Sequence, residues 1–191
     1  MELKNILIGL ALGDLNIEKP SRTGHARLRF AQGLVHEEYL FHLFEKVRPY
    51  CRAVPYFPKT LHNVTGKFYP SIRFNTCTFA CFDELYDLFY PEGKKILPLN
   101  IGELLTPVGL AYFIMDDGHW TGHGITLATN NFTKSEVELL AQVLEDNFDL
   151  KCNIRKDKNV YLIYISAKSI PQLRILIKDF MHPTMLYKLG L

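Results

Sequence analysis

The chain has 191 residues, of which 48% are hydrophobic and 22% charged, and its formal net charge is +2. These values are ordinary for a folded protein and exclude extensive intrinsic disorder. The length allows one sizeable core, or two small subdomains around one core. No apolar stretch reaches the roughly 20 residues of a membrane-spanning helix, so we expect no membrane as a partner.

The cysteine pattern favours free thiols. Four cysteines are too few for a disulfide-rich secreted scaffold. Cys77 and Cys81 have the spacing of half a zinc site, but no second Cys or His pair with ligand spacing accompanies them. The opening MELKNILIGL lacks the basic region and the cleavage site of a signal peptide. We therefore expect a reducing compartment, or a protein that is made where it acts.

The first half of the chain predicts alternating helices and strands. An apolar segment over residues 6–15 contains Asp14 near its end, and a polar turn over 16–24 follows it. Residues 25–32 alternate, with Arg27 and Arg29 on one side, which is typical of a half-buried strand with a basic open face. The remaining elements of this half are a helix over 36–50, strands over 56–61 and 68–76, and a helix over 79–90.

The second half repeats this order. Thr106 and Pro107 provide the N-cap and the first position of an apolar helix that ends in MDDG, residues 115–118. Thr133 and Glu136 form a capping box for a helix that extends to about residue 147. The other elements are a strand over 124–130, a hairpin over 152–156 and 160–166, and a helix over 169–181.

An α-β-α-β-β-α unit used twice indicates a duplicated domain, with one half over residues 1–100 and the other over 101–191. We expect an α+β fold with pseudo-twofold symmetry, two central packed helices and two antiparallel sheets. The two apolar helices should be buried against each other, and Gly9 and Gly13 would let their backbones approach. That packing would place Asp14 and Asp117 side by side. A divalent cation is the simplest neutraliser of two adjacent carboxylates, and hard oxygen ligands favour Mg²⁺.

The two acidic helices also carry a family resemblance. LIGLALGD (residues 7–14) and LAYFIMDDG (residues 110–118) resemble the paired signature of the LAGLIDADG homing endonucleases, in particular the single-chain enzymes encoded in organellar introns. The separation of the two motifs, just over half the chain, fits as well. The resemblance implies the fold of that family, with two sheets that bind DNA. Tyr112 departs from the pattern, because it stands where the family has a small residue and the first motif has Gly9. The helix interface is therefore expected to pair one small residue with one large residue.

The resemblance also implies the site residues. Asp14 and Asp117 would hold the metal, with Gly13 and Asp116 contributing backbone or supporting structure. Lys95 and Lys188 follow the last helix of each half and match the family's basic residues near the scissile phosphates, with Lys94 as the main rival of Lys95. A lysine there could stabilise the charged transition state or polarise water. The role of His119 stays open.

Strand residues are the expected DNA contacts, because alternate side chains of a twisted sheet can read base edges in the major groove. The candidates are polar or basic side chains that interleave with apolar ones. They are Arg27, Arg29, Gln32, Lys59, Arg73 and Asn75 in the first half, and Thr126, Thr129, Asn130, Arg155, Lys156 and Lys158 in the second.

The sequence therefore predicts a monomeric, site-specific, Mg²⁺-dependent DNA endonuclease that acts on a long asymmetric site in a mitochondrion or chloroplast. The compartment and the short 3′ overhangs of the products follow from the resemblance alone. The alternative from another class is a maturase, which binds intron RNA with the same fold and needs basic surface but not the acid pair. A small-molecule hydrolase with a carboxylate pair would need a deep pocket. The net charge of +2 is low for a DNA-binding enzyme.

Overall fold

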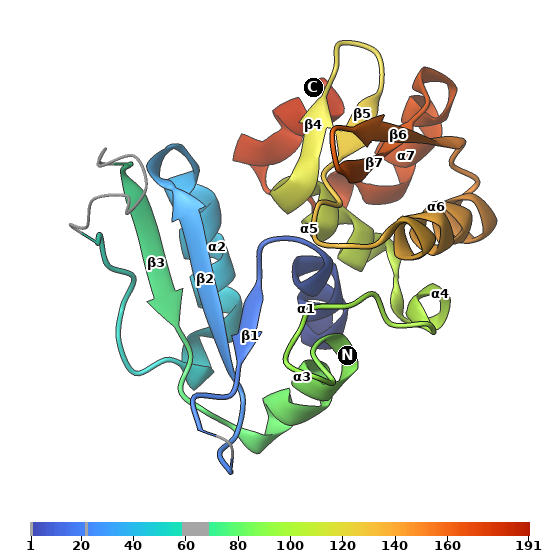
Figure 1. The fold of residues 1–191 in the computed structure, drawn as a ribbon. Helices are drawn as coiled ribbons and strands as arrows, with labels where there is room; N and C mark the ends of the chain where they lie inside the picture. Colours follow the sequence, from blue (N-terminus) through green and yellow to red (C-terminus); the bar gives the residue numbers. More distant parts are fainter. Residues whose placement is uncertain (1, 22, 59–68) are drawn as a thin grey trace. The chain divides into compact units, whose positions relative to one another are not determined.

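The protein is described by a computed structural model that covers residues 2–21, 23–58 and 69–191 (Figure 1). It divides into two compact units. The larger unit comprises the chain up to Gly13 and from Leu88 to Leu191, and the smaller unit comprises Asp14–Asp87. The smaller unit is thus inserted in the sequence of the larger one. Lys59, one of the expected DNA contacts, lies outside the described residues, as does the second half of the strand expected over 56–61.

Two apolar helices form the core of the larger unit. Helices α1 (Glu2–Leu12) and α5 (Pro107–Asp117) lie side by side (Figure 1), and most of their side chains are buried. As expected, Thr106 caps α5 and its hydroxyl accepts a hydrogen bond from the Gly109 amide at 3.2 Å. The backbones touch where two glycines meet, since a Cβ on Gly9 would lie 2.0 Å from the carbonyl oxygen of Gly109. The expectation that a small residue faces a large one is wrong: α5 supplies its own glycine one turn before Tyr112.

An antiparallel sheet of four strands completes the larger unit, in the order β4-β5-β7-β6. Its strands are β4 (Gly118–Trp120), β5 (Ile125–Leu127), β6 (Cys152–Asp157) and β7 (Val160–Ile165). Helix α6 (Lys134–Phe148) packs against β6 and β7, while α7 (Ile170–Ile177) packs against α5 and the short α4 (Ile101–Leu104) against α6. The Thr133–Glu136 capping box that starts α6 is present as the sequence predicts.

In its described residues, the smaller unit forms a sheet of three strands with a helix on one face. The antiparallel order is β1-β2-β3, formed by β1 (Asn16–Glu18), β2 (Arg27–Gly33) and β3 (Ser71–Asn75). Helix α2 (Glu37–Val47) packs against β2 and β3. The rings of Phe30 and Phe74 stack at 4.4 Å between centroids, and Phe44 of α2 meets Phe74 edge-on. These contacts fix which face of the sheet is buried.

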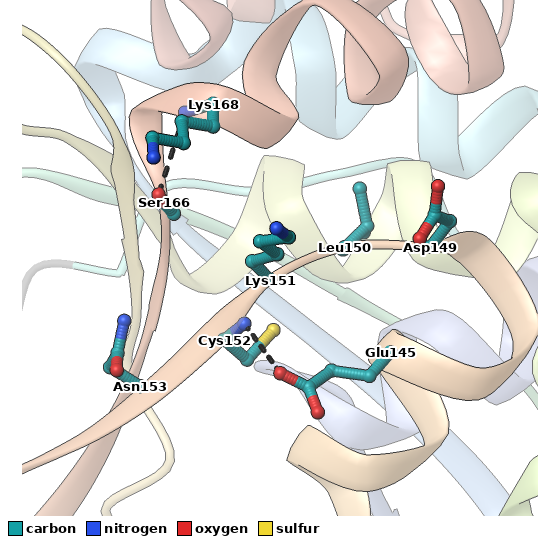
Figure 2. A pocket seen from close by; sticks show the side chains of 8 residues that line it. All are labelled: Glu145, Asp149, Leu150, Lys151, Cys152, Asn153, Ser166 and Lys168. Carbon is teal, nitrogen blue, oxygen red and sulfur yellow. Dashed lines mark hydrogen bonds between the residues drawn. The ribbon is translucent and has the colours of Figure 1, made fainter.

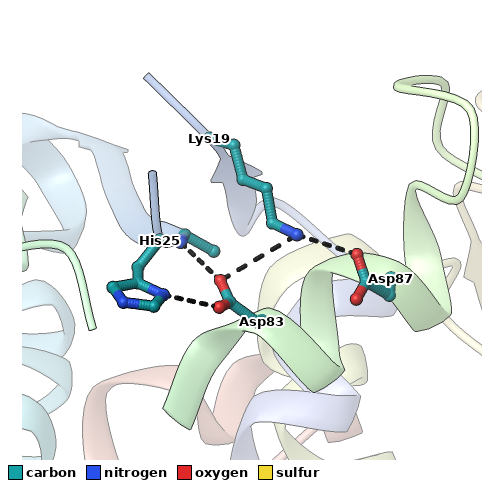
Figure 3. A network of polar contacts seen from close by, with 5 residues as sticks. Lys19, His25, Asp83 and Asp87 are labelled. Carbon is teal, nitrogen blue, oxygen red and sulfur yellow. Dashed lines mark hydrogen bonds and ion pairs between the residues drawn. The ribbon is translucent and has the colours of Figure 1, made fainter. Parts of the chain in front are cut away.

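Polar contacts attach the loop after β1 to helix α3 (Asp83–Phe89) (Figure 3). Asp83 accepts hydrogen bonds from the His25 ring and the Ala26 amide, each at 2.7 Å, and Lys19 lies 2.9 Å from Asp87. The hydrogen bond from His25, followed by that from Ala26, holds the pKa of Asp83 below its ordinary value. The network therefore ties the β1–β2 connection to the start of α3.

Short 3₁₀ turns flank several of the helices. They are Leu34–His36, Arg48–Tyr50, Ala80–Phe82, Ala167–Ser169, Lys178–Phe180 and Pro183–Leu189. The turns next to α2, α3 and α7 explain why the sequence predicts longer helices there, whereas the last turn was not predicted.

The expected α+β class, with two packed helices and two antiparallel sheets, is confirmed. The expected unit α-β-α-β-β-α leaves out the strand that comes after each apolar helix, which is β1 after α1 and β4 after α5. The polar turn starts only after Glu18, so the expectation of a turn from residue 16 is wrong. At three residues each, β1 and β4 are too short to show a period of two. None of the helices in the described ranges is both long and apolar enough to cross a membrane.

Candidate functional site

The two lysines of the expected site lie at equivalent ends of the packed helices. Lys95 donates from Nζ to the carbonyl oxygen of Gly13 at 2.6 Å. Lys188 donates from Nζ to the carbonyl oxygens of Met115 and Asp116, the latter at 2.8 Å. Gly13 and Asp116 directly precede the last acid of each motif. The structure thus brings each lysine to the motif of its own half, over a sequence separation of more than 70 residues.

Lys188 is held by partners that sequence reasoning missed. It is 7% exposed and lies in the last 3₁₀ turn of the chain. Arg174 of α7 donates from Nε and Nη2 to the carbonyl oxygen of the next residue, Leu189, at 3.0 and 2.7 Å. Gly190 has a φ of +70°, and a Cβ there would lie 2.5 Å from the Trp120 indole. Arg174 and Trp120 therefore fix the segment that carries Lys188.

The Lys95 segment is anchored differently. The Ile96 amide donates to the Phe89 carbonyl at 2.8 Å, and the Leu97 amide donates to Glu136 Oε1 at 2.8 Å. Lys95 Nζ lies 5.8 Å from the centre of the Phe132 ring. Lys95 is half-buried, whereas the rival Lys94 is exposed. The two lysines thus share a contact with the helix ends but not the surroundings that support them.

The acids end the two motifs in different surroundings. Asp14 is the first residue of the smaller unit, is exposed, and accepts a hydrogen bond from Gln32 Nε2 at 3.2 Å. Asp117 is half-buried at the end of α5 in the larger unit. The residues before them meet inside the larger unit, since a Cβ on Gly13 would lie 2.6 Å from Asp116 Cβ. Gly13 and Asp116 thus lie next to each other, and the supporting role expected for them stays a prediction.

The donor set fits a hard divalent cation. Carboxylate and carbonyl oxygens at the helix ends are the ligand types that Mg²⁺ takes. Within the described parts of the chain no three His, Cys, Asp or Glu side chains gather in one group that could hold a metal ion. A cation held by either acid would therefore complete its shell with water and substrate oxygens, which is the habit of Mg²⁺.

The open face of the smaller sheet carries most of the expected contacts of the first half. Arg29 pairs with Asn75 and Ala31 with Arg73 across β2 and β3. Their side chains alternate with Leu28, Phe30 and Ile72, which are buried under α2. Gln32 pairs with Ile72 and therefore points to the opposite face from the arginines, where it reaches Asp14.

The two arginines of β2 share one carboxylate that sequence reasoning missed. Arg27 Nε donates to Glu18 Oε1 at 2.7 Å, and Arg29 Nη1 donates to Glu18 Oε2 at 2.9 Å. Partial burial raises the pKa of Glu18, but the hydrogen bonds and charges of Arg29 and Arg27 outweigh it, so the pKa lies below its ordinary value. Glu18 is therefore ionised near neutral pH. Its strand was expected to be a turn, so its place opposite Arg27 could not be anticipated.

The sheet of the larger unit presents Arg155 on its open face. His119, Thr126, Tyr164 and Asn153 form one row across the four strands. The Arg155 guanidinium lies 3.6 Å from the centre of the Tyr164 ring, a cation–π contact. Tyr164, which pairs with Thr126 and Asn153, was not among the expected contacts.

The other expected contacts of the second half are spread over different surfaces. Lys156 points to the other side of β6 from Arg155, because neighbouring strand residues alternate. Asn130 is exposed beyond β5, and Lys158 is exposed in the β6–β7 turn with a φ of +51°. Thr129 is 1% exposed and donates to the Tyr161 carbonyl at 2.6 Å. An expected DNA contact at Thr129 is therefore wrong, because β5 ends at Leu127 and its alternation does not continue.

A cavity of about 550 Å³ opens beside the connection from α6 to β6 (Figure 2). Its lining includes Glu145, Lys151 and Lys168, and Glu145 accepts a hydrogen bond from the Cys152 amide at 3.0 Å. Burial raises the pKa of the Cys152 thiol to about 12, so it stays protonated. All four cysteines are free. None of the expected catalytic residues lines this cavity.

The sequence of the chain is similar to those of known proteins over most of its length. Residues 4–173 match the model of the LAGLIDADG DNA endonuclease family. The cytochrome b mRNA maturase bI2 of Debaryomyces hansenii is 37% identical over 194 residues, which covers 99% of this chain and 74% of that protein. The intron-encoded endonuclease ai4 of Dictyostelium discoideum is 45% identical over 139 residues, covering 71% of this chain and 87% of that protein.

The fold of the chain is also similar to the folds of solved structures. The homing endonuclease I-WcaI bound to its DNA recognition sequence matches with a TM-score of 0.92 and 30% identity, over 99% of this chain and 86% of that one. I-DmoI in complex with DNA and Mn shares the fold, with a TM-score of 0.53 and 16% identity, over 92% of this chain and 96% of that one. This chain belongs to the LAGLIDADG DNA endonuclease family.

Proposed function

We propose that the protein is a site-specific endonuclease that cuts both strands of double-stranded DNA as a monomer. The observation that carries this proposal is the duplicated contact between a lysine ammonium and the carbonyl that precedes the last acid of each motif. Two such groups at equivalent helix ends suit two scissile phosphates, one on each strand. The DNA-bound I-WcaI relative, similar over nearly the whole chain, supports DNA as the partner.

We assign Asp14 and Asp117 to a divalent cation, with Mg²⁺ as the expected ion. When bound, the cation would supply Lewis-acid stabilisation of the charge that develops on the phosphodiester. The acids would hold the cation, while the Gly13 and Asp116 carbonyls accept hydrogen bonds from the two lysines. Lys95 and Lys188 then provide fixed positive charge where the pentavalent phosphate gains negative charge.

The DNA-binding surface of this proposal consists of the open faces of the two sheets. In the smaller unit Arg27, Arg29, Arg73 and Asn75 share one face, as the register requires. In the larger unit Thr126 and Arg155 share the face of Tyr164. Asn130 and Lys158 lie in exposed turns and would contact the phosphate backbone. A direct reading of bases by Gln32 and Lys156 is disfavoured, because both point to the opposite faces of their sheets.

Selection from a randomised DNA library tests the proposal. The protein is incubated with the library and Mg²⁺, and the ends of the cleaved molecules are sequenced. We expect enrichment of one long asymmetric site, with cleavage lost when EDTA removes the cation. Digestion without enrichment would contradict site specificity, and the absence of any cleavage would contradict the endonuclease.

A maturase is the second candidate, because the relative from Debaryomyces hansenii that is aligned with 99% of this chain carries that name. This function needs an RNA-binding surface and does not need the paired acids. Splicing of the host intron in the presence of wild-type protein and of an Asp14→Asn, Asp117→Asn double variant distinguishes the two. If the double variant still supports splicing, the protein acts on RNA by a function that does not need the paired acids. A name that refers to cytochrome b mRNA also agrees with the organelle, mitochondrion or chloroplast, that we propose as the compartment.

A further inference from the structure

The open face of the smaller sheet presents a carboxylate where the proposed function expects phosphate. Glu18 lies opposite Arg27 in the β1–β2 register, and Arg29 is the next residue of β2 on the same face. Each oxygen of Glu18 accepts from a different arginine, at 2.7 and 2.9 Å. A fixed negative charge on a DNA-binding surface opposes binding to every sequence alike. Its presence between two arginines therefore calls for a function other than affinity.

Stability does not supply that function. The side chains of Glu18, Arg27 and Arg29 are 28%, 34% and 46% exposed. Ion pairs at this exposure contribute little to folding, because water screens the charges and ordering the side chains costs entropy. What the arrangement does provide is order: two long side chains are held in fixed positions above the sheet.

The arrangement also leaves donors for a ligand. A guanidinium has five N–H donors in a rigid plane, and Glu18 has only two oxygens to share between two arginines. An arginine whose plane is already fixed loses less entropy when it forms a bidentate contact with guanine. The same carboxylate lowers the net positive charge of the face and so weakens its attraction for phosphates in general.

We propose that Glu18 is a positioning residue that sets the sequence specificity of the smaller sheet. It orients Arg27 and Arg29 toward base edges and reduces their binding to the phosphate backbone. This inference rests on the proposed function, because it takes the open face of the sheet as the surface that meets DNA. The larger unit orients its own arginine by another device, since Arg155 stacks on Tyr164. The effect of Glu18 is thus confined to one half of the target.

Three variants of the full chain separate geometry from charge. Glu18→Gln removes the charge, while Glu18→Asp keeps the charge on a side chain too short to reach both arginines. Glu45→Gln is the matched control, because Glu45 is exposed on α2, on the opposite face of the sheet, and also pairs with an arginine, Arg48, at 3.3 Å. Each variant and the wild type are taken through library selection, followed by titration of the selected duplex and of a scrambled duplex.

We expect Glu18→Gln to bind the scrambled duplex several-fold more tightly than wild type. Its ratio of target to scrambled affinity should fall about tenfold, with the loss of base preference confined to one half-site. Glu18→Asp should lose the base preference in the same half-site, but its affinity for the scrambled duplex should stay at the wild-type value. Glu45→Gln should shift both affinities alike and keep the wild-type base preferences.

Two results overturn the inference. Either Glu18→Gln and Glu18→Asp select the wild-type site with unchanged base preferences, or their loss spreads evenly over both half-sites. Failure of the proposed function is distinct, because in that case the wild type itself selects no site. Thermal unfolding of each variant excludes a general loss of structure as the cause of a changed profile.

Discussion

At the scale of single residues, the proposed chemistry uses two acids and two lysines that lie in different surroundings. Lys188 is nearly buried and donates to two carbonyls, whereas Lys95 is half-buried and donates to one. Asp14 is exposed and Asp117 is half-buried. The two halves therefore share residue types but not environments, and the two strands of a substrate need not be cut at the same rate.

Asp14→Asn and Asp117→Asn should each reduce cleavage at least about a hundredfold. The amide removes the charge that holds the cation but keeps the size of the side chain, and the sheets are untouched. Binding of the target duplex should stay within a few-fold of wild type. A cleavage assay and a gel-shift titration in Mg²⁺ measure the two quantities. Asp146→Asn, on the exposed side of α6, serves as the control, and wild-type cleavage by either of the first two variants would remove that acid from the metal site.

Lys95→Met and Lys188→Met should slow cleavage more than they weaken binding. Methionine keeps most of the aliphatic stem, so the loss reports the ammonium group that opposes charge in the transition state. If each lysine serves one strand, each variant should accumulate a nicked intermediate, and the two variants should nick opposite strands. Supercoiled plasmid that carries the selected site reports nicking and linearisation separately.

The exposed neighbour Lys94 provides the control for this series. Lys94→Met should leave the ratio of nicked to linear product unchanged. If Lys94→Met slows cleavage and Lys95→Met does not, the assignment within this pair is reversed. A loss in Lys95→Met or Lys188→Met that weaker binding explains completely would make that lysine an ordinary phosphate contact.

At the scale of elements, the contact between α1 and α5 is set by two glycines. Gly9→Ala should destabilise the protein by about 1–3 kcal/mol or more, because the new Cβ would meet the Gly109 backbone and not a flexible side chain. Gly102→Ala in α4 is the control, since its Cβ would meet Val143 at an ordinary 3.4 Å. Urea unfolding followed by circular dichroism compares the two. A Gly9→Ala variant as stable as Gly102→Ala would show that the helices can separate at no cost.

Elements with local signals could be predicted, and contacts between distant residues could not. The Thr106–Pro107 start of α5 and the Thr133–Glu136 capping box depend on neighbours within three residues, and both were predicted correctly. Strand β1 has three residues and no visible alternation, so Glu18 went unrecognised. Arg174 binds a carbonyl 15 residues away, which no periodicity reveals. The assignment of Lys95 and Lys188 came from the family resemblance and from their equivalent places in the two halves, and it stays a prediction.

At the scale of the whole molecule, the duplication is covalent and the halves have diverged. The smaller sheet presents paired arginines held by a carboxylate, and the larger sheet presents one arginine stacked on a tyrosine. Protein symmetry is mirrored in the symmetry of a DNA site, so unlike halves predict an asymmetric site. Each half should follow about one helical turn, which gives a target on the order of 20 bp.

Sedimentation of the complex with the selected duplex should therefore give one chain per duplex. Affinity should fall steeply as salt rises, because Lys and Arg contacts to phosphate release counterions. Mapping the product ends should show short 3′ overhangs at the centre of the site. Two chains on a palindromic duplex would show that the two halves of the chain do not form one enzyme.

The shared carboxylate of Glu18 has a consequence for the evolution and redesign of the protein. Two arginines that depend on one partner are not independent positions, and substitutions at such positions are not additive. If Arg27 alone is replaced, both oxygens of Glu18 can bind Arg29. The orientation of Arg29 then changes, and with it the base preference at a base pair that Arg27 does not contact. Retargeting of this half therefore has to vary residues 18, 27 and 29 together. On the other sheet, Arg155 and Tyr164 form a separate pair that can drift or be redesigned on its own.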